Sequence, residues 1–248
     1  MVYPDPTALL AEYRALAIEL LHRDGLRLLI HDDLARFTSL LEAAPKNAGV
    51  NPAFDPRRVE MGAAFWLDVK SADGSSAAVM AAKLLITEGY YADVAAGHIW
   101  GCDPLTLAIT GPDIGGRLAH TGGLWVAPDW RGIGLSWLVP RLIKAIALQL
   151  WNVDHSTGLA FASLHQAGIA EKNYGAQKIR LLVDGWFPPT GQIERIYATE
   201  YDRSYLLQSV REDARVIADH RNHQMRDLAP IASKRQHQAP IDADPIAR

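Results

Sequence analysis

The stretch from Leu124 to Leu138 holds the residues best suited to chemistry in this sequence. It reads Leu-Trp-Val-Ala-Pro-Asp-Trp-Arg-Gly-Ile-Gly-Leu-Ser-Trp-Leu. An apolar run, a small-residue turn and a second apolar run together predict a strand, a turn and a helix. The main-chain N–H groups of such a turn point toward one spot, and the helix start adds roughly half a positive charge. We therefore predict an anion site here, and a pyrophosphate suits it well.

Glycine is expected in this turn because a Cβ would keep phosphates away from the backbone. Two other phosphate-binding loops fit less well. A dinucleotide-binding loop requires a third glycine where Trp137 stands, and an acid at the end of the next strand, whereas Asp154 precedes that strand. A Walker-type loop needs Gly-Lys-Ser/Thr, which the sequence lacks. A turn that binds nothing is the remaining alternative.

The patterning around the turn predicts the elements that must position it. Asp73-Gly74 tolerates the positive φ angles of a hairpin, so two adjacent antiparallel strands are expected there, which argues against a purely βαβ protein. Thr7 and either Asp32 or Asp33 are expected to cap helices. Residues 87–116 are expected to form an irregular connection with a short helix. Strands are expected at residues 26–30, 65–70, 77–86, 120–126, 157–163, 178–183 and 193–201, and helices at 7–22, 32–44, 136–151, 166–177 and 211–228.

The turn resembles the pyrophosphate loop of the GNAT superfamily of acyltransferases, written Gln/Arg-x-x-Gly-x-Gly/Ala. Arg131, Gly134 and Ser136 stand at its three marked positions, with Ser in place of the usual Gly or Ala. The preceding Val-x-Pro-x-x-Arg-Gly, which begins at Val126, is also similar to many members. The predicted elements follow the family order of strand, helices, three antiparallel strands, helix, strand, helix and two strands.

This resemblance implies an α/β (α+β) fold, in which helices flank a mixed, mostly antiparallel central sheet. Residues 25–210 would form the acyltransferase domain, with 87–117 as an insertion between its third and fourth strands. Residues 1–24 would add an N-terminal helix packed on that domain. Residues 211–248 would add a C-terminal helix and a flexible tail, disordered from about residue 229.

The resemblance also implies a reaction. Acetyl-CoA, or another acyl-CoA, would be the co-substrate, no metal would be needed, and a small-molecule or peptide amine would attack the thioester directly. The strands before and after the glycine turn would splay apart around the pantetheine arm. The residues expected to bind the co-substrate are Trp125, Val126 and Ala127 through main-chain atoms, and Arg131, Gly132, Ile133, Gly134, Leu135 and Ser136 around the pyrophosphate.

The expected catalytic residues are His120 and Tyr174. His120 stands where many members have a Glu, and a pKa near 6.5 would let it take a proton at neutral pH, directly or through water. An ordinary strand-end or surface histidine is the alternative. The family's acid, a Tyr four residues before a Gly-Phe pair, is replaced here by Glu171. Protonation of the thiolate could then come from Tyr174, from water or from no dedicated acid. The Asn that often opens this helix is also missing, with His165 and Gln166 nearby.

Several aromatic residues lie in segments that could wall the acceptor pocket, although core packing is their usual role. They are Tyr90, Tyr91, Trp100, Trp186 and Phe187, the last two in the loop between the final strands. A protein with this fold that binds coenzyme A or a partner without transferring anything is the alternative function.

Composition excludes several other classes of protein. A net charge of −3 without a long basic run argues against nucleic-acid binding. The sequence lacks an apolar run of about 18 residues, so no membrane span is expected. The N-terminus does not read as a secretory signal. Cys102 is the single cysteine, so no intrachain disulfide can form and a cytoplasmic location is expected. A homodimer is compatible with all of this.

Overall fold

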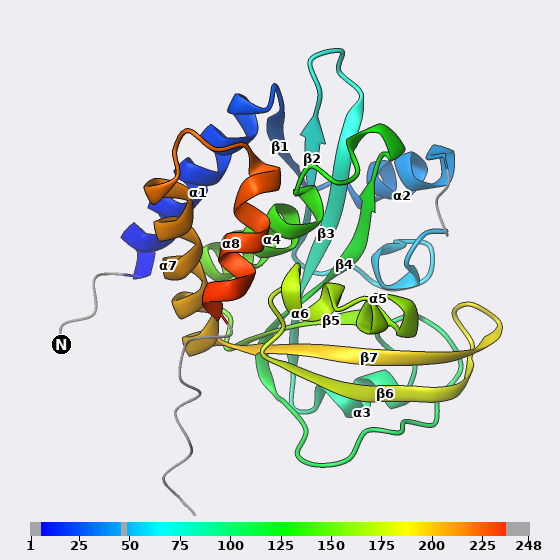
Figure 1. The fold of residues 1–248 in the computed structure, drawn as a ribbon. Coiled ribbons are helices and arrows are strands. Elements are labelled where there is room, and N and C mark those ends of the chain that lie inside the picture. The colour runs from blue at the N-terminus through cyan, green and yellow to red at the C-terminus, as the bar shows by residue number, and fades with distance from the viewer. Residues whose placement is uncertain (1–5, 46–48, 237–248) are drawn as a thin grey trace, which may run out of the picture.

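A computed structural model describes residues 6–45 and 49–236. Within these ranges a single sheet has the strand order β1-β2-β3-β4-β5-β7-β6, and its neighbours are antiparallel except for the parallel pair β4–β5 (Figure 1). The strands are β1 (Arg27–His31), β2 (Ala64–Lys70), β3 (Ser76–Thr87), β4 (Gly116–Val126), β5 (His155–Phe161), β6 (Lys178–Phe187) and β7 (Gln192–Asp202). The expected mixed, mostly antiparallel sheet is confirmed. A dinucleotide-binding fold, which is built on a parallel sheet, is excluded.

Helices cover both faces of the sheet (Figure 1). One face carries α1, α4, α7 and α8 over a core that includes Leu20, Trp137 and Ile217. The other face carries α2, α3 and the short turn η1 over Phe37, Phe54 and Trp66. The helical segments are α1 (Pro6–Arg23), α2 (Leu34–Ala43), η1 (Pro52–Phe54), α3 (Tyr90–Ala95), η2 (Pro128–Trp130), α4 (Leu135–Trp151), α5 (Ala162–Gln166), α6 (Ile169–Lys172), α7 (Arg203–Asp219) and α8 (Met225–Gln236).

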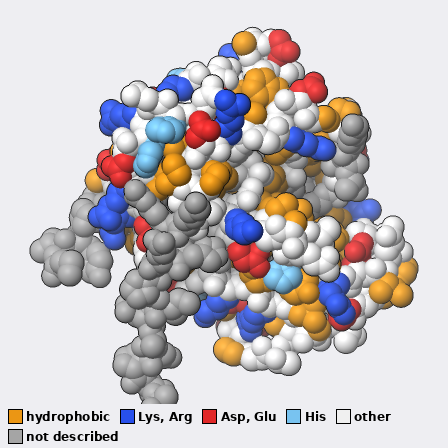
Figure 2. All heavy atoms as spheres, viewed as in Figure 1, with side chains coloured by type: hydrophobic (Ala, Val, Ile, Leu, Met, Phe, Trp, Pro, Cys, Tyr) orange, Lys and Arg blue, Asp and Glu red, His pale blue; other side chains and the backbone are white. Residues whose placement is uncertain are grey.

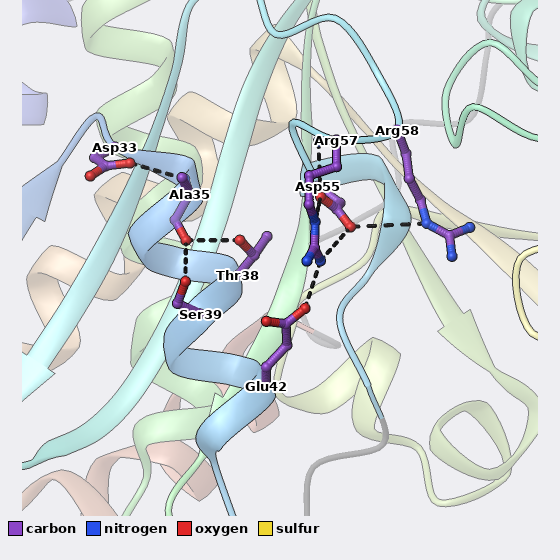
Figure 3. Close-up of polar contacts among 8 residues, drawn as sticks. All are labelled: Asp33, Ala35, Thr38, Ser39, Glu42, Asp55, Arg57 and Arg58. Carbon is purple, nitrogen blue, oxygen red and sulfur yellow. Dashed lines mark hydrogen bonds and ion pairs between the residues drawn. The ribbon is translucent and has the colours of Figure 1, made fainter.

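Local signals set the ends of several elements as predicted. Gly74 has a φ of 85° in the turn that joins β2 to β3. Asp33 caps α2, because its Oδ1 accepts a hydrogen bond from the N–H of Ala35 at 3.0 Å (Figure 3) and another from the N–H of Arg36 at 3.1 Å. Thr7 is not the cap of α1, since the helix already includes Pro6, which fits the first helical turn.

The segment after α2 is fastened to that helix by charge pairs (Figure 3). Arg57 donates to both oxygens of Asp55 at 2.8 and 2.9 Å, and to Glu42 of α2 at 2.6 Å. Burial of Asp55 opposes its charge, but the hydrogen bonds from Arg57 outweigh burial and lower the pKa of that carboxyl. The clamp holds η1 so that Phe54 lies fully buried against the sheet.

Several predicted elements differ from those observed. The helix expected over 166–177 is replaced by two short helices over 162–166 and 169–172, because Gly168 adopts a φ of 68° between them. The first of these begins within the strand that was expected to end at residue 163. The single helix expected over 211–228 is two helices, because α7 begins at Arg203, directly after β7, and ends at Asp219, whereas α8 begins at Met225. Asp202 caps α7 by accepting from the N–H of Tyr205 at 2.8 Å. Trp186 and Phe187 lie in β6 rather than in a loop.

The C-terminal region is more ordered than predicted up to residue 236. Residues 229–236 belong to α8, whose Met225, Leu228 and Ala232 are buried against the helical face. This stripe is too short to stand out in a polar sequence, but it suffices where α4 and α7 already offer apolar surface. Residues 237–248, expected to be disordered, lie outside the described ranges.

A buried ion pair joins α4 to α7. The Nη1 of Arg141 donates to both carboxylate oxygens of Asp213 at 3.1 and 3.0 Å, and both side chains are almost fully enclosed. On the face seen in Figure 2, basic and acidic side chains are interspersed over the described residues. No helix within the described ranges is long and apolar enough to cross a membrane.

Candidate functional site

The parallel strands β4 and β5 run together only briefly. Their pairing joins Leu118, Ala119 and His120 to His155, Ser156 and Thr157, in that order. Beyond the last pair, β4 stays with β3 as far as Val126, whereas β5 stays with β7 as far as Phe161. The two strands therefore diverge from His120 and Thr157 onward, as the resemblance predicts.

A bulge in β4 lies just beyond this point. The register with β3 shifts between Val79 and Ala81, and Gly123 has a φ of 65°. A Cβ on Gly123 would come within 2.9 Å of the Phe37 ring, and one on Gly122 within 3.0 Å of Phe54. Bulges bend the strand that contains them, so this one turns the end of β4 away from the straight path.

The glycine turn at the end of β4 has the predicted form. η2 follows the strand, Gly132 and Gly134 have φ angles of 80° and 101°, and α4 begins at Leu135. The N–H groups of Trp137 and Leu138 return to the carbonyl of Gly134 at 2.9 and 3.0 Å. Arg131 is exposed and donates from Nε to the carbonyl of Val126 at 3.2 Å.

Five consecutive N–H groups of this turn point to no acceptor in the described part of the chain. They belong to Gly132, Ile133, Gly134, Leu135 and Ser136. The first turn of a helix leaves such donors without intrahelical partners, and the helix dipole adds positive potential at the same end. An anion placed there would satisfy several of them at once.

The two glycines serve different purposes. A Cβ on Gly132 would meet nothing within 4 Å, so this position is open to a ligand. A Cβ on Gly134 would lie 2.9 Å from both the Cγ and the carbonyl oxygen of Met225 in α8. The expectation that both glycines make room for phosphate is therefore wrong for Gly134, where the chain's own C-terminal helix takes the space.

The remaining residues that are predicted to bind the co-substrate lie beside this turn. Ser136 accepts a hydrogen bond at Oγ from Nδ2 of Asn173 at 2.8 Å, which fastens the residues after α6 to the first turn of α4. The N–H of Ala127 donates to the carbonyl of Ala77 in β3 at 2.9 Å. Trp125 is buried, with Nε1 donating to the carbonyl of Pro45 at 3.4 Å. All these positions line the end of β4 or the start of α4.

His120 is enclosed by the face of the sheet that carries α3. Its Nδ1 lies 3.2 Å from both the Tyr90 hydroxyl and the Thr157 hydroxyl, and its ring stacks on Phe54 at 5.6 Å. Its Nε2 is buried and has no hydrogen-bond partner among the described residues. Burial, and secondarily the charge of Lys83, lowers the pKa of His120 to about 3. This pKa lies below the expected value near 6.5. His120 is buried in the middle of β4, neither at a strand end nor on the surface, and its catalytic role stays a prediction.

His120 belongs to a row of polar residues that crosses the sheet. The pairings place Lys83, His120, Thr157 and Glu200 side by side on β3, β4, β5 and β7. All four are buried. Burial lowers the pKa of Lys83 to about 8, and its Nζ donates to the carbonyl of Ile99 at 3.0 Å.

Glu200 closes this row with two partners. It accepts hydrogen bonds from the Tyr91 hydroxyl at 2.7 Å and from Nε of Arg180. Arg180 also lies over the Tyr91 ring at 4.7 Å. The sequence patterns do not single out Lys83 or Glu200. Lys83 could have been found as the single charged residue in the apolar run of β3, because a lysine is rarely buried without a partner. Glu200 lies among other charged residues of β7, so the sequence holds no such signal for it.

The aromatic residues singled out from the sequence lie in three different places. Tyr90 and Tyr91 contact the polar row from α3. Trp100 and Phe187 pack edge to face at 5.2 Å in the core. Trp186 is 62% exposed and lies beside a hollow of about 230 Å³, formed with residues 104–108, away from the glycine turn.

Tyr174 lies on the other side of the sheet from His120. Its carbonyl accepts from Nζ of Lys144 at 2.6 Å and from the Tyr201 hydroxyl at 3.2 Å, both in the core beneath α4. Burial raises the pKa of its phenol to about 12. The two expected catalytic residues thus make their contacts on opposite faces of the sheet.

Comparisons with known proteins gave structural matches alone. No family model and no curated sequence matches the chain. Similar solved structures include Arabidopsis thaliana NAA60 in complex with acetyl-CoA, at 14% identity and a TM-score of 0.45, over 72% of this chain and 99% of that one. Another is spermidine N-acetyltransferase from Vibrio cholerae in complex with CoA and spermine, at 14% identity and a TM-score of 0.46, over 74% and 99%. The element order from β1 to β7, with the glycine turn after β4, is the order that the sequence resemblance predicts, so the chain has a GNAT-type fold.

Proposed function

We propose that the protein is an acyl-CoA-dependent N-acyltransferase that moves an acetyl group from acetyl-CoA to an amine. The observation that carries this proposal is the run of five N–H groups, from Gly132 to Ser136, without an acceptor at the start of α4. It lies at the end of β4, beyond the point where β5 turns away. An elongated ligand with a pyrophosphate at one end fits this combination better than a free phosphate would.

In this proposal, different parts of the chain bind the pyrophosphate, the pantetheine arm and the amine. The N–H groups and the start of α4 bind the pyrophosphate, with Arg131 at the exposed edge of the turn. The side of β4 that β5 leaves offers main-chain groups near Val126 to the amides of the pantetheine arm. The amine approaches the thioester carbonyl from the face that carries His120. Catalysis then rests on positioning and on proton transfer, without a covalent enzyme intermediate.

His120 contributes a neutral imidazole in this scheme. Its low pKa keeps the ring uncharged at neutral pH, and Tyr90 and Thr157 hold Nδ1. The enclosed Nε2 can accept a hydrogen bond from the amine or from a water molecule that receives the amine's proton. With so low a pKa, His120 would position the amine or water by a hydrogen bond rather than hold the transferred proton itself.

A second candidate is a coenzyme A-binding protein that transfers nothing. The observation in its favour is the enclosure of His120, whose side chain is 0% exposed and covered by Phe54 and Tyr90. An active site on this face would need Phe54 or α3 to move before an amine could reach Nε2.

Two measurements test these candidates. Calorimetric titration with coenzyme A tests the anion site, and no heat of binding at millimolar ligand would contradict both. Release of free thiol from acetyl-CoA, measured with a panel of primary amines, tests transfer. Binding together with amine-dependent thiol release supports the acyltransferase, whereas binding without thiol release for any amine supports the second candidate.

A further inference from the structure

His165 of α5 and Glu171 of α6 form a pair that no continuous helix would create. The left-handed Gly168 ends α5 and turns α6 back, so that Nδ1 of His165 lies 3.0 Å from Oε1 of Glu171. The side chains are 31% and 34% exposed. Nδ1 and the second Glu171 oxygen, Oε2, are nevertheless closed off from solvent and lack an aligned hydrogen bond among the described residues.

The imidazole ring is held from a second side. Tyr197 of β7 packs against it, with 4.2 Å between ring centroids and 40° between ring planes. The carboxylate of Glu171 and the phenol of Tyr197 are thus the ionisable groups that face His165 from α6 and from β7. A histidine oriented by a carboxylate through Nδ1 has its Nε2 left for proton transfer. Such contacts often align only when substrate binds.

The pair lies between the two parts of the proposed site. α5 follows directly from Phe161 at the end of β5, the strand that turns away from β4. Asn173, just after α6, is bonded to Ser136 in the first turn of α4. Figure 1 shows α5 and α6 in front of β5, between α4 and β7. A ligand that extends from the glycine turn toward the diverging strands would pass this pair.

We propose that His165, positioned by Glu171, is the acid that protonates the departing thiolate of the acyl donor. This inference rests on the proposed acyl transfer. The amine nitrogen bonds to the thioester carbonyl carbon, the carbon–sulfur bond breaks and its electron pair leaves on sulfur. The proton on Nε2 of the His165 imidazolium passes to that sulfur and yields the free thiol. The nitrogen of the new amide releases its surplus proton to water, and water reprotonates His165.

Tyr174 is less suited to this role. Its main chain is held beneath α4 by Lys144 and Tyr201. Burial raises the pKa of its phenol to about 12, so its proton is held more tightly than that of an imidazolium. Glu171 stands at the position where the family has the Tyr that acts as the acid, and in the structure its carboxylate lies next to the imidazole of His165.

Turnover of acetyl-CoA with the best amine of the panel tests the inference. We expect His165→Gln to lower kcat about 100-fold or more, while the KM for acetyl-CoA and the Kd for coenzyme A change less than about twofold. Glu171→Gln should lower kcat about 10-fold and alter the pH profile of kcat. Imidazole added to His165→Ala should restore part of the rate, which a purely structural role would not allow.

A matched control is available in His98→Gln. His98 is also a histidine whose Nδ1 faces a carboxylate, that of Asp93 at 3.4 Å, but it is exposed and follows α3. The kcat of the His98→Gln variant should equal that of the unaltered chain. If the unaltered chain is active and His165→Gln matches it, the inference is wrong while the proposed function stands. If the unaltered chain releases no thiol with any amine, the proposed function fails, and the inference fails with it.

Discussion

The main chain of Met225 lies where a side chain on Gly134 would have to be. Only 2.9 Å would separate a Cβ of Gly134 from the carbonyl oxygen of Met225, and Met225 itself is fully buried. The first residue of α8 therefore forms one side of the glycine turn. The N–H of Met225 donates to the carboxylate of Asp24, just after α1, at 3.2 Å, and this bond helps to fix the main chain of Met225.

Gly134→Ala should consequently lower the free energy of unfolding by at least about 2 kcal/mol. The strain of a positive φ angle on alanine and the clash of its Cβ with the main chain of Met225 both contribute to this loss. Chemical denaturation measures this loss. Gly132→Ala is the matched control, since Gly132 also has a positive φ angle but a Cβ there would meet no other atom within 4 Å. This variant should lose only about 1 kcal/mol of the free energy of unfolding. Equal losses for the two variants would show that α8 does not pack on the turn as described.

Gly132→Asp should abolish coenzyme A binding while the protein stays folded. A carboxylate at this open position repels the pyrophosphate, yet a negative charge near a helix start does not harm the helix. We expect the Kd to rise more than about 100-fold, given the cost of placing like charges together in a site. Calorimetry measures it, with Gly132→Ala as the control for backbone strain. Tight binding by Gly132→Asp would remove this turn from the site.

His120 should make the protein sensitive to acid. Its folded pKa is about 3 and its unfolded value 6.5, so the unfolded chain takes up the proton first as the pH falls. The contribution of the buried neutral ring to the free energy of unfolding is fully present above pH 6.5, and it is lost progressively as the pH falls to 3. Between pH 7 and pH 5 this loss is about 2 kcal/mol.

His120→Asn tests this expectation, because its side-chain oxygen can still accept from Tyr90 or Thr157 but does not titrate. Urea denaturation at pH 7 and pH 5 should show that the variant loses about 2 kcal/mol less than the unaltered chain over that interval. Identical pH dependence would mean that His120 is not enclosed as the structure describes.

Lys83 should act at the opposite end of the pH scale. Its folded pKa of about 8 lies below its unfolded value of 10.5, so the charged amine favours the unfolded chain at neutral pH. This penalty is full below pH 8 and disappears as the pH rises through 10.5. We expect the stability difference between Lys83→Met and the unaltered chain to shift by about 2 kcal/mol between pH 7 and pH 10, in favour of the unaltered chain at the higher pH.

Denaturation at a series of pH values measures this shift. A constant stability difference between Lys83→Met and the unaltered chain would show that the amine of Lys83 remains hydrated in the folded protein.

Much of the fold follows from local patterns in the sequence. The Asp73-Gly74 hairpin, the Asp33 cap and the glycine turn before α4 are each specified by neighbouring residues, and the structure has all three. The same is true of the element order that predicted the GNAT-type fold. Errors arose where one glycine or one short apolar stripe decided the outcome, as at Gly168 and in α8.

The sequence by itself determined the strand, the glycine turn and the helix around Arg131–Ser136, and it predicts an anion site there. Only the tertiary structure decided which residues surround it. The row from Lys83 to Glu200, the pair of His165 with Tyr197 and the contact of Met225 with Gly134 all join segments far apart in the chain. The pKa of His120 falls to about 3 because Phe54, Tyr90 and Lys83 are packed around it, and burial of this kind arises from packing between elements, which no local pattern encodes.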